Sequence, residues 1–92
     1  MAGVSVEQSA VKGAISLCNQ SIENFRKTGS DLMQKYQQAE SSWKDAKYKQ
    51  LGSIVSDCKS ALDNPISELE SCRAKLEALL AAIIEYESTN LS

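Results

Sequence analysis

The chain has 92 residues, which is enough for one small domain and too few for two hydrophobic cores. Its formal charge is −2, and its lysines and arginines are scattered among acidic residues instead of forming a basic stripe, so we expect no nucleic-acid binding. Histidine is absent, which removes the commonest general base and a common zinc ligand. We therefore expect no catalytic residues, no metal and no cofactor.

The amino terminus does not resemble a Sec signal peptide, because no apolar stretch follows a charged segment there. The longest mainly apolar run, residues 76–84, is far shorter than the roughly 20 residues of a membrane-spanning helix. We expect a cytoplasmic protein without a membrane span, and any export would use a Sec-independent route.

The first predicted element is a long amphipathic helix over residues 5–40. From Val11 onward its apolar positions alternate in steps of four and three, which is the spacing of a heptad seam. The apolar positions of this half are Val4, Val11, Ile15, Cys18, Ile22, Phe25, Gly29, Leu32, Tyr36, Ala39 and Trp43. Gly29 costs about 1 kcal/mol relative to alanine inside a helix, and its place on the seam predicts close approach of another backbone.

A turn is predicted at residues 41–44. Ser42 followed by Asp45 fits a capping pattern in which the serine oxygen accepts from the first amides of a new helix and the acid lies near its positive end. Two apolar seams joined by a short turn bury each other, so the helices run antiparallel. Trp43 would then cover the end of the joint seam.

The second predicted helix spans residues 45–88 and repeats the seam spacing. Its seam positions are Tyr48, Leu51, Val55, Cys58, Leu62, Pro65, Leu69, Cys72, Leu76, Leu79, Ile83 and Tyr86. The register passes through Pro65 without a slip, which favours one long helix kinked there. In the alternative, residues 63–65 end one helix and begin another, with Asn64 as the N-cap and Pro65 as the first helical residue. The fold class is an all-α antiparallel helical hairpin.

The remaining polar candidates have structural interpretations. Cys18, Cys58 and Cys72 occupy seam positions, where we expect small buried hydrophobes in a reducing compartment, with a Cys18–Cys72 disulfide as the alternative. The carboxylates of the second helix are expected on its solvated face, paired with Arg73 and Lys75. They are Glu68, Glu70, Glu77, Glu85 and Glu87.

The open end of the hairpin carries more apolar residues than one seam can bury. Residues 79–84 are apolar on almost every side, and a soluble protein normally hides such a patch in an interface. We predict a dimer, or a heteromeric four-helix bundle, formed through this end. The predicted interface residues are Val4, Val11, Leu79, Leu80, Ile83, Ile84 and Tyr86. A membrane-surface anchor is less favoured, because the flanking residues are acidic.

The segment Trp43-Lys44-Asp45, placed between two helices in a chain of this length, resembles the turn motif of the WXG (ESAT-like) family of small type VII secretion proteins. The resemblance covers nearly the whole chain. It implies a helical hairpin that dimerises into a four-helix bundle and serves as a secreted substrate or as a partner that helps to deliver larger effectors. Asp45 stands where the strict motif has glycine, which makes this a divergent Trp-x-Asp version.

The family's carboxy-terminal export signal, Tyr-x-x-x-[Asp/Glu], would begin at Tyr86, but the fourth residue onward is Asn90. This departure favours an adaptor or chaperone role, in which the chain binds the helical leader of a larger LXG-type toxin. The alternatives are a self-assembling structural subunit and a general coiled-coil adaptor. The expected partner is a second copy, another small hairpin or such a leader.

Overall fold

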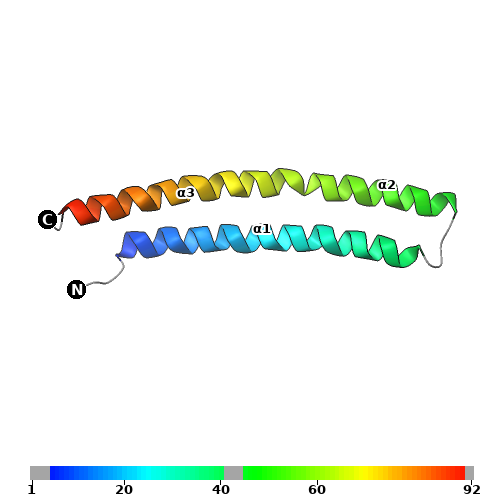
Figure 1. Cartoon of the computed structure of the whole chain (residues 1–92), viewed down its shortest axis with the longest axis horizontal. Coiled ribbons are helices and arrows are strands. Elements are labelled where there is room, and N and C mark those ends of the chain that lie inside the picture. Colours follow the sequence, from blue (N-terminus) through cyan, green and yellow to red (C-terminus); the bar gives the residue numbers. More distant parts are fainter. Residues whose placement is uncertain (1–4, 41–44, 91–92) are drawn as a thin grey trace.

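A computed structural model describes residues 5–40 and 45–90 of the chain. It contains three helices in these ranges: α1 (Val6–Ala39), α2 (Ala46–Ala61) and α3 (Asp63–Asn90). Helix α1 lies antiparallel to α2 and α3, which follow each other in nearly one line as the second arm (Figure 1). The described residues thus form an all-helical hairpin, as the apolar spacing predicted. The predicted turn at 41–44, with Trp43, lies outside the described residues.

Both arms begin with a side-chain cap. The Ser5 hydroxyl accepts from the backbone N–H of Gln8 at 3.0 Å, and the Asp45 carboxylate accepts from the N–H groups of Lys47 at 2.9 Å and Tyr48 at 3.3 Å. Asp45 is therefore itself the N-cap of α2. It lies at the positive end of the helix, as predicted, while Ser42, the residue predicted as the cap, lies outside the described residues. Aspartate is a strong N-cap because its carboxylate both accepts the amides and offsets the positive end of the helix.

The second arm is interrupted at Leu62, three residues before Pro65. The Leu62 N–H donates to the carbonyl of Lys59 at 3.2 Å, which tightens the last turn of α2. Pro65 lies in the first turn of α3, where its missing N–H costs little. The structure lies between the two arrangements predicted at Pro65. The arm is divided, as in the alternative, but it continues in nearly one line, and Asn64 is inside α3 instead of capping it.

The seam of the second arm is displaced by one residue from the predicted one at alternate positions, both in α2 and in α3. The half-buried positions that repeat in steps of four and three are Ile66, Leu69, Arg73, Leu76, Leu80, Ile83 and Glu87. Leu69, Leu76 and Ile83 also belong to the predicted seam. The prediction is wrong for Cys58, Cys72, Leu79 and Tyr86, which are exposed. The step from Leu62 to the next seam residue, Ile66, is four residues and not the three that a seam through Pro65 requires.

The hairpin has a thin core. Among the described residues, the buried hydrophobic side chains are Ile22 and Val55. The molecule measures 71 × 20 × 13 Å and has a radius of gyration of 20.8 Å, whereas a compact chain of this length would have a radius of about 12 Å. Its accessible surface is 6831 Å², against roughly 5,200 Å² for a compact monomer of this mass. One hairpin therefore leaves a large surface available for another molecule.

Two glycines face the opposite arm. Gly29 is buried on the seam, where a Cβ would lie 3.5 Å from Leu62 Cδ1 and 3.6 Å from Lys59 Cγ. The second arm does approach α1 closely there, but it does so through side chains and not through its backbone. At Gly52 a Cβ would lie 2.7 Å from the hydroxyl oxygen of Tyr36. Both glycines therefore make room for side chains from the other arm.

Candidate partner-binding surface

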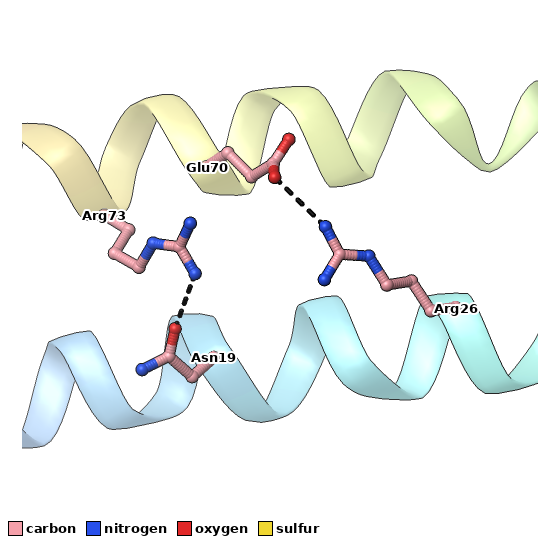
Figure 2. Close-up of polar contacts among 4 residues, drawn as sticks. All are labelled: Asn19, Arg26, Glu70 and Arg73. Atoms are coloured by element: carbon pink, nitrogen blue, oxygen red, sulfur yellow. Dashed lines mark hydrogen bonds and ion pairs between the residues drawn. The ribbon is translucent and has the colours of Figure 1, made fainter.

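One flank of the hairpin is polar, and its side chains contact each other across the two arms. Figure 2 shows Arg73 of α3 donating to the Asn19 side-chain oxygen of α1, with an N–O distance of 2.7 Å. In the same view Arg26 of α1 pairs with Glu70 of α3 at 3.1 Å. The Arg26–Glu70 pair is solvent-exposed, so its contribution to stability is small. This polar flank is engaged by contacts within the hairpin itself.

Beside the seam, α2 and α3 carry a second apolar stripe. Its members repeat every seven residues, which is close to two helical turns, so they share one side of the arm. They are Leu51, Cys58, Pro65, Cys72, Leu79 and Tyr86, and we call them the outer stripe. Leu79 is 49% exposed and Tyr86 is 67% exposed. Glu77 lies seven residues after Glu70 and therefore belongs to the same polar flank. Leu79 lies about 160° around the helix from Glu77, so the outer stripe and the polar flank lie on nearly opposite sides of the arm.

The outer stripe ends in an apolar groove at the open end of the hairpin. This groove has a volume of about 320 Å³, and its apolar lining comes from Ala82, Ile83 and Tyr86 of α3. The side chains of Glu7 on α1 and Glu87 on α3 complete it. The groove therefore combines an apolar lining with two acidic side chains, and we call it the acidic groove.

At the other end of the outer stripe, the first turns of α2 form an apolar corner with a basic residue. Leu51 and Ile54 line a shallow hollow of about 170 Å³ together with Lys47 and Gln50. Ile54 is 52% exposed. We call this group the basic corner. The two ends of the outer stripe thus differ in charge.

The predicted interface residues are divided between different surfaces. Leu79 and Tyr86 lie on the outer stripe, and Ile83 lines the acidic groove as well as the seam. Leu80 and Val11 are half-buried within the hairpin, so they belong to its own seam.

Ile84, although 44% exposed, repeats at seven residues from Glu77 and therefore belongs to the polar flank. Val4 lies outside the described residues. The part of the surface contributed by α2, which is Leu51, Ile54 and Cys58, was not predicted as interface. For Leu51 and Cys58 the signal was present in the seven-residue spacing, but that spacing was assigned to the seam, whereas Ile54 lies outside that spacing.

A stacked aromatic pair holds the turn end of the hairpin. The rings of Tyr36 and Tyr48 lie 4.6 Å apart between centroids, with 13° between their planes. Removal from water, followed by a hydrogen bond with Tyr36 and the nearby negative charge of Glu40, raises the pKa of Tyr48 to about 12. Tyr48 therefore stays protonated at neutral pH, and we assign the pair a structural role.

The cysteines do not form a disulfide in this structure. Cys18 is half-buried, and Cys58 and Cys72 are exposed on the outer stripe. Within residues 5–40 and 45–90, no group of three Cys, Asp or Glu side chains is arranged to hold a metal ion. None of the helices in the same ranges is long and apolar enough to cross a membrane.

Comparison of the chain with known protein families, with curated proteins and with solved structures found no match.

Proposed function

We propose that this chain is a non-enzymatic helical protein of a type VII secretion system. In this role it binds the helical leader of a larger LXG-type effector as an adaptor or chaperone, or it is itself a secreted substrate of the WXG type. The exposed outer stripe supports the binding role. Large apolar side chains such as Leu79 and Tyr86 remain uncovered at one flank of a hairpin whose own core is small. Burial of this stripe against a partner helix would remove apolar surface from water at about 25 cal/mol per Å².

The secretion context rests on the resemblance of the turn sequence. Trp43-Lys44-Asp45 stands between two long helices in a chain of the appropriate length, and the second arm carries Tyr86 near its end. Tyr86 is exposed, which a residue recognised by the secretion machinery must be. The position four residues on is asparagine, so we favour the adaptor role over independent export.

The binding role can be tested by affinity capture from the native cytosol with three tagged baits: the wild-type chain, Leu79→Glu and Ile84→Glu. The two substituted residues have similar exposure, 49% and 44%, but lie on opposite flanks. We expect the wild type and Ile84→Glu to recover a larger protein with a long helical leader in near-equal amount. Leu79→Glu should lose it. Equal recovery by all three baits, or by none, would contradict the proposal.

The secretion context needs a separate measurement. We expect the amount of the captured effector in the medium to fall when the gene for this chain is deleted, and to be restored by the wild type and by Ile84→Glu but not by Leu79→Glu. An effector level that is indifferent to the deletion would favour the alternative of a general coiled-coil adaptor.

A self-assembling structural subunit is the second candidate function. The outer stripe continues over both α2 and α3. A stripe of this length favours the structural-subunit role, because copies that overlap along only part of it would leave the rest free to bind further copies. Light scattering at increasing concentration tests this alternative. The mass of a filament grows without limit, whereas the mass of a closed dimer stops at twice that of one chain.

A further inference from the structure

We propose that a hollow on the polar flank binds a small phosphorylated molecule with a hydroxyl-bearing body, such as a sugar phosphate. The phosphate group would lie between Arg26 of α1 and Lys59 of α2. This inference does not depend on the outer stripe or on the secretion context, because it concerns the other flank of the hairpin. It requires that the two cations converge on one cavity, that no acidic side chain compete for them there, and that hydrogen-bonding side chains be available for the body of the ligand.

The hollow is formed mainly by one side of α1. It has a volume of about 530 Å³, which is within the range of small-molecule sites in proteins. Met33 lies seven residues after Arg26, so the hollow continues the polar flank from Arg26 towards the turn end of the hairpin. We call it the basic hollow, and its lining residues are Arg26, Ser30, Met33, Gln34, Gln37 and Lys59.

Lys59 reaches the basic hollow from the opposite arm. A Cβ at Gly29 would lie 3.6 Å from Lys59 Cγ and 4.0 Å from Lys59 Cε, so the aliphatic stem of this lysine lies across Gly29 of α1. This places Lys59 in the lining beside Arg26 and Ser30. Among the described residues Lys59 forms no ion pair, although Asp63 follows it by about one helical turn. Its positive charge is therefore not compensated by a carboxylate of the hairpin.

Arg26 supplies the second positive charge of the basic hollow. One nitrogen of its guanidinium group, Nη2, donates to the Glu70 carboxylate at 3.1 Å (Figure 2). A guanidinium group has five N–H donors in a planar fork, so the contact with Glu70 leaves further donors for an oxyanion. Glu70 holds the guanidinium group from the side of α3 and does not itself line the hollow. Arg26 is thus oriented by one carboxylate while it borders a cavity that contains none.

The charge of the lining selects an anion as the ligand. Two lining residues are cations from different arms, and none is acidic. A phosphate group suits this position because it carries a charge of about −1.5 to −2 at neutral pH and has three acceptor oxygens, enough to bind Arg26 and Lys59 together. The same two cations border an adjoining hollow of about 300 Å³, which Asp63 and apolar side chains line. We therefore place the phosphate on the side that has no acid.

The rest of the lining favours a polar body on the ligand. Gln34 and Gln37 each carry an amide that both donates and accepts hydrogen bonds, and the Ser30 hydroxyl does the same. Within the described part of the chain, these three side chains make no hydrogen bond to another residue. The hydroxyl groups of a sugar have the same double character, so they can pair with these side chains in place of water.

The first part of the test compares three probes. The full chain, isotope-labelled for NMR, is titrated at fixed ionic strength with glucose phosphorylated at its primary hydroxyl group. We expect saturable shifts of backbone signals around the basic hollow. Inorganic phosphate should bind there roughly tenfold more weakly, because it lacks the hydrogen bonds of the body. Glucose should cause no shift. If glucose bound as tightly as its phosphate, the role of the two cations would be wrong, and an equal affinity for inorganic phosphate would exclude recognition of the body.

The second part separates this site from a general attraction of anions to lysines. Lys59→Gln and Arg26→Gln should each weaken binding of the sugar phosphate by about tenfold, because each removes a charged donor to the phosphate. Lys49→Gln is the matched control, since it removes the same charge from the same helix about 15 Å away and should leave the affinity unchanged. Arg26→Gln also breaks the pair with Glu70. Arg26→Lys keeps the charge without the planar fork, so its affinity should lie between those of Arg26→Gln and the wild type.

Three results would overturn the proposed site. A wild-type chain that shows no saturable shift with either phosphate probe does not have it. Equal weakening by Lys49→Gln and Lys59→Gln would mean that the anion responds only to the net charge of the chain. Wild-type affinity in both Lys59→Gln and Arg26→Gln would place the phosphate elsewhere. Circular dichroism of each variant checks its helicity, and Lys59→Gln should keep it because Lys59 takes part in no ion pair among the described residues.

Discussion

At the scale of single residues, the glycines of the two arms separate helix propensity from packing. Gly29→Ala and Gly13→Ala should each raise the free energy of unfolding by about 0.5–1 kcal/mol, because alanine is the better helix former. A Cβ at Gly29 meets Leu62 and Lys59 at ordinary contact distance, and at Gly13 nothing lies within 4 Å. Gly52→Ala should instead lower the free energy of unfolding by about 1–2 kcal/mol, because the new Cβ would lie 2.7 Å from the Tyr36 hydroxyl oxygen. Urea unfolding at one fixed chain concentration measures all three. A Gly52→Ala variant as stable as Gly13→Ala would show that Tyr36 moves freely.

Also at this scale, Tyr48 makes folding sensitive to alkaline pH. Its pKa is raised to about 12 in the folded chain, against about 10 for an ordinary tyrosine. The unfolded chain therefore releases this proton first, so the contribution of Tyr48 to stability is complete below pH 10 and is lost as the pH rises towards 12. Unfolding titrations across that range should show a weaker loss of stability in Tyr48→Phe than in the wild type, with Tyr86→Phe as the matched control. Equal pH dependence in all three chains would place the Tyr48 pKa near its ordinary value.

At the scale of helices, the seam of α3 is best tested with two adjacent leucines. Leu80 is half-buried against α1, whereas Leu79 is 49% exposed on the outer stripe. Leu80→Ala should lower the free energy of unfolding by about 1–2 kcal/mol at any chain concentration, less than the 2–5 kcal/mol of a fully buried leucine. Leu79→Ala should have little effect in dilute solution, where the outer stripe is uncovered. Unfolding of both variants at low concentration decides the register, and the opposite order would restore the predicted seam through Leu79.

The same scale shows what the sequence could and could not predict. Periodic apolar spacing was sufficient for two antiparallel arms, because a heptad pattern continues over many turns and small errors average out. It was insufficient for the register of α3, because Leu69, Leu76 and Ile83 belong to both possible seams and cannot distinguish them. Arg73 and Glu87 were assigned to the solvated face, but across the seam they find the side chains of Asn19 and Gln8. Such pairings depend on which residues of the other arm lie at the same height. The division of the surface into a polar flank and an outer stripe followed from that register and was missed with it.

At the scale of the whole molecule, folding and association should be coupled. A hairpin with Ile22 and Val55 as its buried hydrophobic side chains, among the residues described, has little core to hold it together. Anything that binds the folded state adds stability by mass action, so a chain that pairs with itself should become more stable with concentration. We expect the melting temperature of the wild type to rise by several degrees over a hundredfold increase in concentration, because each 1 kcal/mol moves the melting temperature of a domain this small by about 4–8 °C. Leu79→Glu should melt at a temperature that does not depend on concentration, while Ile84→Glu should follow the wild type. A concentration-independent wild type would show that the chain does not pair with itself under these conditions, and that the outer stripe is left uncovered unless a different molecule binds it.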